Sequence, residues 1–168
     1  MHRNILIALV AVLTGAPFPL AAQPLPGDRL IVPGVRIGAA ELMPADQGAL
    51  ERALGAPDQT DRRGDHDVYR YGADQLVVDF DLVLDAPFEI STTSPLYRTR
   101  DGLGVGSPLT TIRARLGAAI CQGGDDAGEG LLAYDSIWFL SSRGIVSRVS
   151  IRANVNPTTL SAGSIACR

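Results

Sequence analysis

The stretch "DGLGVGSPLTTIRARLGAA" (residues 101–119) follows the same order of features as an earlier stretch, "PGVRIGAAELMPADQGALERALGAP" (residues 33–57). Five pairs of positions match: Gly34 with Gly102, Ile37-Gly38 with Val105-Gly106, and Leu54-Gly55 with Leu116-Gly117. Repetition of this kind indicates one structural unit that is used twice.

The glycines of residues 101–106 first suggest a phosphate site, because glycine-rich loops before a helix expose backbone N–H groups to anions. A dinucleotide-binding loop needs G-x-G-x-x-G, and Ser107 stands where the third glycine belongs. The chain also contains no lysine for a phosphate loop. We therefore interpret Gly102 and Gly106 as turn residues at the entrance of a helix.

Each stretch predicts one short helix. In the later stretch Ser107 is the expected N-cap and Pro108 the first helical residue, and Gly117 ends the helix. In the earlier one Pro44 opens the helix and Gly55 ends it. Helical spacing turns five leucine or isoleucine side chains inward: Leu50, Leu54, Leu109, Ile112 and Leu116.

Strand patterns follow both predicted helices. After the first come residues 67–72, 75–84 and 88–94, and after the second come residues 131–140 and 145–155. The sequence "SSRG" (141–144) predicts a hairpin turn between the last two. The predicted fold class is α+β: two tandem helix-plus-antiparallel-sheet repeats, residues 23–98 and 99–168, that form one compact unit.

This arrangement resembles two related groups of small exported bacterial proteins. The residues that carry the resemblance are Ile37-Gly38, Leu54-Gly55, Val105-Gly106 and Leu116-Gly117. One group is the β-lactamase inhibitory proteins, which have two tandem helix-plus-sheet repeats, although this chain lacks their many aromatic residues. The other is the outer-membrane assembly lipoproteins of the BamE type, although this chain has no lipid-attachment cysteine. The resemblance implies a fold, and neither activity follows from a fold alone.

The first 22 residues are typical of a secretory signal peptide. Met1 to Arg3 form a basic head, an apolar run covers residues 5–13, and small residues precede the expected cleavage after Ala22. We expect a periplasmic or secreted protein with no membrane span after cleavage. The net charge of −3 gives no support to nucleic-acid binding.

Two cysteines, Cys121 and Cys167, are the only ones in the chain. An even pair in an exported protein predicts a disulfide, here one that ties the C-terminal tail to the middle of the chain.

Aromatic and arginine side chains on the predicted strands are the candidate binding residues, because such residues dominate protein interfaces. They are Tyr69, Tyr71, Tyr134, Trp138, Arg148 and Arg152. The sequence thus predicts a non-enzymatic exported protein that binds another envelope or extracellular protein through a sheet face. This prediction includes no catalytic residue, no metal site and no cofactor.

Two other functions stay open. A small periplasmic hydrolase or metal-binding enzyme could use the acidic loops around His66 (with Asp61, Asp65 and Asp67) or around Asp125 (with Asp126 and Glu129). A small-ligand carrier would need a deep apolar cavity between the sheets. Asp79 and Asp81, two residues apart, are expected on the solvent side of a strand.

Overall fold

The computed structural model of the chain describes residues 28–43, 45–124 and 128–153. Several predicted features lie outside the described residues: the signal peptide (1–22), Pro44, Asp125, Asp126 and Cys167.

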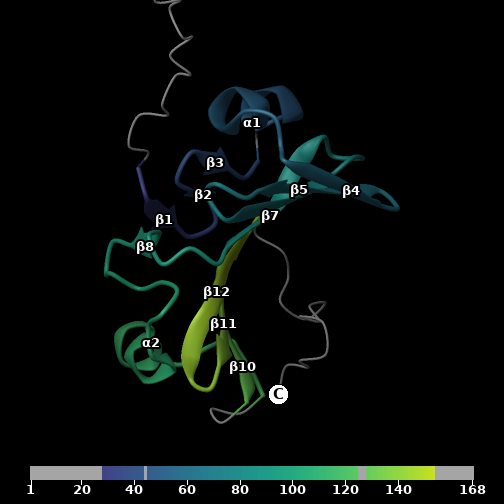
Figure 1. Cartoon of the computed structure of the whole chain (residues 1–168). Helices are drawn as coiled ribbons and strands as arrows, with labels where there is room; N and C mark the ends of the chain where they lie inside the picture. The colour runs from purple at the N-terminus through teal and green to yellow at the C-terminus, as the bar shows by residue number, and fades with distance from the viewer. Residues whose placement is uncertain (1–27, 44, 125–127, 154–168) are drawn as a thin grey trace, which may run out of the picture.

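Two sheets and two short helices make up the described part of the chain (Figure 1). The larger sheet is antiparallel and has the strand order β4 (Gln59–Arg63), β5 (His66–Tyr71), β6 (Leu76–Asp81), β7 (Ala86–Thr92), β12 (Ile145–Arg152), β11 (Ile137–Ser142), β10 (Glu129–Tyr134) and β9 (Cys121–Gly124). The smaller sheet has the order β3 (Ala40–Glu41), β2 (Arg36–Ile37), β1 (Leu30–Val32) and β8 (Arg98–Thr99). The helices are α1 (Gln47–Leu54) and α2 (Leu109–Leu116).

The predicted α+β class, with two helix-plus-sheet repeats, is wrong: the fold is mainly β. Each helix has only eight residues, whereas the described strands number twelve. Five strands follow α1 and four follow α2. Of these, β4 to β7 and β9 to β12 do not form two separate sheets, because β7 pairs with β12 and joins all eight into one. The expected boundary at residues 98–99 falls within β8. This strand lies at the edge of the small sheet and pairs with β1, a strand from the start of the described chain.

Both helices end as their sequences predict, and both begin elsewhere. Gly55 and Gly117 close α1 and α2 with positive φ angles of 82° and 78°. Helix α1 begins after Asp46, whose carboxylate accepts a hydrogen bond of 2.6 Å from the Ala49 N–H. At α2 the expected N-cap is wrong by one residue, because Pro108 occupies that position.

The Ser107 hydroxyl instead accepts hydrogen bonds from the Gly104 N–H at 3.1 Å and from Arg98 Nη1 at 3.2 Å. It thereby holds the turn before α2 and leaves the helix without a side-chain cap. Gly102 and Gly106 have φ angles of +78° and +89° in this turn, which confirms that they are turn residues.

Tight hairpins connect most neighbouring strands. Arg143 and Gly144 have positive φ angles of 53° and 74°, which confirms the turn predicted for "SSRG" between β11 and β12. The segment 131–140, expected as one strand, turns at residues 135–136 and forms the hairpin of β10 and β11. The sequence pattern does not predict β4.

One core fills the space between the large sheet, the small sheet and the helices. Its largest fully buried members include Phe80, Phe139, Leu50, Ile112 and Ile31. Helix α1 covers the end of the large sheet near β4 and β5, and α2 lies at the opposite end near β11 (Figure 1). The core therefore occupies one face of the large sheet, which leaves the other face for the candidate site.

Candidate functional site

The large sheet has an inner face toward the core and an outer face away from it. The pairing register places alternate side chains on each face. Inner-face residues such as Val78, Phe80, Val149 and Ile151 are fully buried in the core. The outer face is defined by these residues: Asp61, Arg63, His66, Val68, Arg70, Val77, Asp79, Glu89, Ser91, Arg148, Ser150, Arg152, Trp138, Leu140, Leu131, Ala133 and Cys121.

The outer face is charged on one half and apolar on the other. Strands β9 to β11 carry a separate apolar cluster, formed by Cys121, Leu131, Ala133 and Trp138, with Leu140 packed against it. Strands β4 to β7 and β12 carry the charged side chains. The partition follows from the sequence of the strands, because the outward positions in the middle of β10 and β11 hold four apolar residues, Leu131, Ala133, Trp138 and Leu140.

Ion pairs cross the charged half between neighbouring strands. Arg70 Nε lies 3.3 Å from Asp61 Oδ2, and Arg152 Nη2 lies 2.6 Å from Glu89 Oε2. The Arg152 guanidinium also lies 3.9 Å from the ring centroid of Trp138, a cation–π contact. Arg152 thus connects the charged half with the apolar half.

His66 and Asp79 face each other without forming a hydrogen bond. His66 Nδ1 lies 3.7 Å from Asp79 Oδ1, which is too long for a hydrogen bond. Both atoms are buried, and neither has a hydrogen-bond partner among the described residues. Burial raises the pKa of Asp79, while the nearby His66 lowers that pKa and Glu89 raises it.

Strand β6 has two carboxylates, Asp79 and Asp81, and their contributions to the stability of the protein should change with pH in opposite directions. Because burial raises the pKa of Asp79, its contribution to stability is present at acid pH and is lost as pH rises through the folded pKa. Replacing Asp79 by asparagine should therefore stabilise the protein relative to wild type as pH increases from about 3 to about 7. Hydrogen bonds from Leu84 and Val83 lower the pKa of Asp81, so Asp81→Asn should become destabilising over the same range.

Urea unfolding of both variants and wild type at several pH values measures these differences. Two curves that run in parallel would contradict the prediction, because the two variants share a strand and differ chiefly in the environment of the carboxylate.

A hollow of about 270 Å³ lies in the charged half. Its lining includes Arg63, Arg70 and Arg148 together with the carboxylates of Asp79 and Glu89. Arg148 is exposed and forms no ion pair with any residue that the structure describes. Arg63 is likewise exposed and without an ion pair among the described residues, so two of the three arginines at this hollow, Arg63 and Arg148, lack an ion-pair partner.

The six candidate binding residues separate into two groups. Trp138, Arg148 and Arg152 lie together on the outer face. Tyr69 and Tyr71 are buried in the core on the inner face, and burial raises the pKa of Tyr71 to about 12. Tyr134 packs against the core and donates a hydrogen bond of 3.1 Å to the Gly117 carbonyl.

The acidic residues around His66 do not converge on one site. Asp67 is buried and pairs with Arg62 on β4, while Asp61 pairs with Arg70. Only Asp65 lies within 3.1 Å of His66 Nε2 in this group. Within residues 28–43, 45–124 and 128–153, no cluster of three or more potential metal ligands occurs.

Cys121 lies on the edge strand β9 in the apolar cluster and is not a free thiol. Its predicted partner, Cys167, lies outside the described residues, so the pairing remains a prediction.

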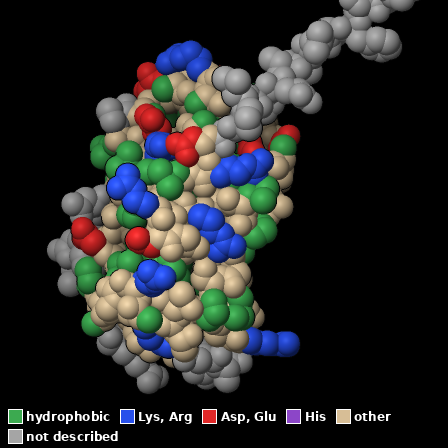
Figure 2. Space-filling view, turned by 90° about the vertical axis from the view of Figure 1, so that its left-hand side faces the viewer, with side chains coloured by type: hydrophobic (Ala, Val, Ile, Leu, Met, Phe, Trp, Pro, Cys, Tyr) green, Lys and Arg blue, Asp and Glu red, His purple; other side chains and the backbone are tan. Residues whose placement is uncertain are grey.

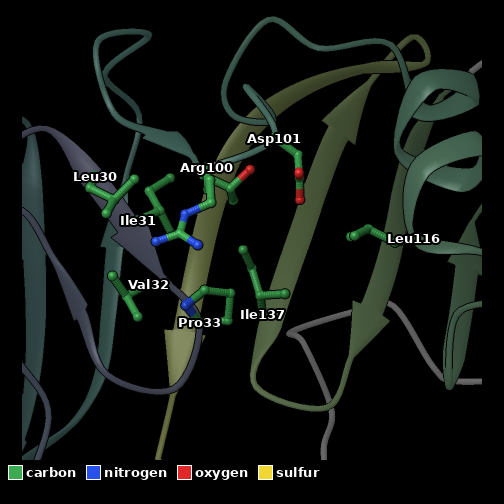
Figure 3. A pocket seen from close by; sticks show the side chains of 9 residues that line it. Leu30, Ile31, Val32, Pro33, Arg100, Asp101, Leu116 and Ile137 are labelled. Atoms are coloured by element: carbon green, nitrogen blue, oxygen red, sulfur yellow. The ribbon is translucent and has the colours of Figure 1, made fainter.

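A second, apolar pocket lies between the two sheets (Figure 3). Its volume is about 210 Å³, and it is lined by residues of β1, the segment after β8, the end of α2 and the start of β11. It lies where a carrier's cavity was envisaged, and it is smaller than the roughly 300–1,000 Å³ of most small-molecule sites.

Sequence reasoning missed Asp79, Glu89, Arg63 and Arg70 as members of a site. The spacing of Asp79 and Asp81 did indicate a shared strand face, but Glu89 and Arg63 belong to other strands. Only the register of β4 to β7 brings them to one hollow.

No protein-family model matches this chain, and no curated protein matches it. Solved structures do resemble its fold. A DUF4309 family protein (YjgB) from Bacillus subtilis has a TM-score of 0.50 and 16% identity, over 71% of this chain and 88% of that one. At this identity the likeness shows the fold alone.

Two further structures are more distant. An extracellular protein containing a SCP domain from Bacillus anthracis has a TM-score of 0.49 and 7% identity, and a cysteine-rich secretory protein from Staphylococcus aureus has 0.47 and 13%. The aligned part covers 64% of this chain and only 43% of each of those chains. Neither structure bears on the resemblance to β-lactamase inhibitory proteins or BamE-type lipoproteins, which remains a prediction.

The described helices are too short and too polar to cross a membrane.

Proposed function

We propose that this chain is an exported, non-enzymatic protein that binds another envelope or extracellular protein through the outer face of its large sheet. The signal-peptide pattern of residues 1–22 supports export. The broad outer face, with charged and apolar halves side by side, supports recognition of a protein surface.

Arg148 is the single observation that carries the proposal. Its side chain is exposed and without an ion pair in the described part of the chain, beside a hollow that also contains Arg63 and Arg70. An arginine in this state can pair with a carboxylate of a partner without first breaking an ion pair of its own. The partner surface that fits this half of the face carries at least one acidic side chain.

Trp138 and Arg152 have a different part in the binding surface. Trp138 is only 3% exposed, so it cannot itself provide much contact area to a partner. It holds the Arg152 guanidinium through the cation–π contact, and Glu89 holds the same group from the other side. We assign Trp138 as a positioning residue and Arg148 as the contact residue.

The test is an affinity pull-down of the exported protein from the envelope extract of its own cells. A protein retained by wild type should be lost with Arg148→Glu, since reversing a central interface charge costs about 2 kcal/mol or more, roughly thirtyfold in Kd. The matched control is Arg52→Glu. Arg52 is exposed and lies on α1, and this helix packs on the inner face of the large sheet, away from the proposed binding surface. The control should retain the partner as wild type does.

Equal retention by Arg148→Glu and Arg52→Glu would contradict the proposed surface. Isothermal titration with Zn²⁺ and Ca²⁺ tests the rival enzyme hypothesis in the same preparation. Tight metal binding together with no retained protein would overturn the binding function in favour of that alternative.

A further inference from the structure

We infer that the pocket between the two sheets binds a small aliphatic monocarboxylate, with its alkyl chain inside the pocket and its carboxylate on Arg100. The pocket is separate from the outer face, so this inference goes beyond the proposed protein-binding function.

The walls of the pocket are almost entirely apolar. Leu30 and Val32 project from β1, Ile137 begins β11, and Leu116 ends α2 (Figure 3). Ile137 is buried, but Leu116 is 36% exposed although it belongs to an apolar lining. An alkyl group in the pocket would remove this apolar surface from water, which is favourable.

The volume limits the ligand to a short chain. At about 210 Å³ the pocket is smaller than the sites that enclose drug-sized ligands, roughly 300–1,000 Å³. It can therefore take a short alkyl chain, while the polar end of the ligand stays at the mouth.

The charged side chain at the mouth of the pocket, Arg100, determines which polar group the ligand must have. Arg100 is exposed and lines the pocket, and its guanidinium lies over the apolar walls between Leu30 and Ile137 (Figure 3). It forms no ion pair with any residue in the described ranges. A guanidinium binds a carboxylate through two parallel hydrogen bonds. Asp101, also at the pocket, would repel a second negative charge, which favours a monocarboxylate.

The segment that carries Arg100 is held in place by hydrogen bonds. The Thr99 N–H donates to the Leu103 carbonyl at 2.8 Å, and the Gly102 N–H donates to the Thr99 carbonyl at 2.9 Å. The Leu103 N–H also donates to Thr99 Oγ1 at 3.1 Å. The backbone on either side of Arg100 is therefore already ordered, so ligand binding needs to order only the Arg100 side chain.

The two sheets are in close contact beside the pocket. Gly34, in the turn after β1, lies so near Ser136 that a Cβ at this position would be 2.9 Å from the Ser136 Cβ. The turn after β1 therefore packs directly on the turn before β11, next to the pocket. On the side of the molecule that includes β1, β8 and α2, arginine side chains are interspersed with apolar ones (Figure 2).

The experiment is an NMR titration of the ¹⁵N-labelled exported protein with sodium hexanoate and, separately, with 1-hexanol. We expect saturable shifts for the amides of residues 30–32, 99–101 and 137. Hexanoate should bind about tenfold more tightly than the alcohol, since a hydrogen bond to a charged group contributes about 1.5 kcal/mol or more.

Three variants separate the role of Arg100 from general charge effects. Arg100→Gln should weaken hexanoate about tenfold and leave 1-hexanol unchanged, while Asp101→Asn should strengthen hexanoate. Arg115→Gln, which removes an exposed charge from α2 outside the pocket lining, should change neither. Equal thermal unfolding midpoints confirm that the variants are folded.

The inference is overturned by the absence of saturable shifts, by shifts centred on other residues, or by equal affinity of wild type and Arg100→Gln for hexanoate. Each of these outcomes leaves the protein-binding test with Arg148→Glu unaffected, because the two sites share no residue.

Discussion

Replacement of Phe139 by alanine is expected to lower the free energy of unfolding by about 4 kcal/mol. Phe139 lies on β11 with no exposed surface, and it packs edge-to-face on Tyr134 with ring centroids 6.2 Å apart. Removing the ring loses its burial and leaves a cavity that the surrounding strands cannot close, because its neighbours Leu132 and Val149 are held by strand pairing.

Equilibrium unfolding in urea measures the effect, with circular dichroism as the readout. Ile145→Ala on the adjacent strand β12 is the control, because Ile145 is 44% exposed and should cost about 0.5 kcal/mol or less. Similar losses from both substitutions would show that Phe139 is not at the centre of the core.

Gly38→Ala is the second substitution with a large expected effect, about 3 kcal/mol of destabilisation. Gly38 has a φ of +59°, which alone costs a residue with a Cβ about 1–2 kcal/mol. Its added Cβ would also lie 2.8 Å from Tyr97 Cε1 and 3.0 Å from the Asp28 carbonyl oxygen. Tyr97 is buried, so its ring cannot move aside without disturbing the core.

Gly64→Ala provides the matched control. Gly64 has a similar φ of +67° in the turn between β4 and β5, but no atom lies within 4 Å of its added Cβ. It should cost only the backbone strain of about 1–2 kcal/mol. Thermal unfolding of both variants tests the difference, and equal midpoints would contradict the close approach of Tyr97 to Gly38.

The sequence predicted the helices better than the strands. Helical spacing and glycine stops located α1 and α2 to within a few residues, because both signals act within one or two turns. The strands of the small sheet have only two or three residues, too few to show alternation. Strand β4, "QTDRR", has no apolar residue, because it is an edge strand with little surface in the core.

The fold class was wrong because local patterns do not reveal which strands pair. The sequence showed helices followed by strands and predicted a separate sheet for each helix. The pairing of β7 with β12 joins segments that are distant in the chain and makes a single sheet. That pairing is stabilised by burying one continuous inner face, and no local signal reports it.

For the candidate site too, the sequence predicted some features and not others. Alternation showed that Val149 and Ile151 share one face of the last strand and Arg148 and Arg152 the other. It could not show that Tyr69 and Tyr71 face the core, because either face of β5 has an apolar or aromatic member.

By itself the sequence determined where the helices end, where the "SSRG" hairpin turns and which side chains of β12 share a face. These features depend on dihedral preferences and side-chain spacing within a few residues. Only the tertiary structure decided that Arg148 lies beside Asp79 and Glu89, and that β1, α2 and β11 enclose a pocket under Arg100. Such neighbours arise because the whole chain must bury its apolar faces together, and that requirement acts between residues far apart in sequence.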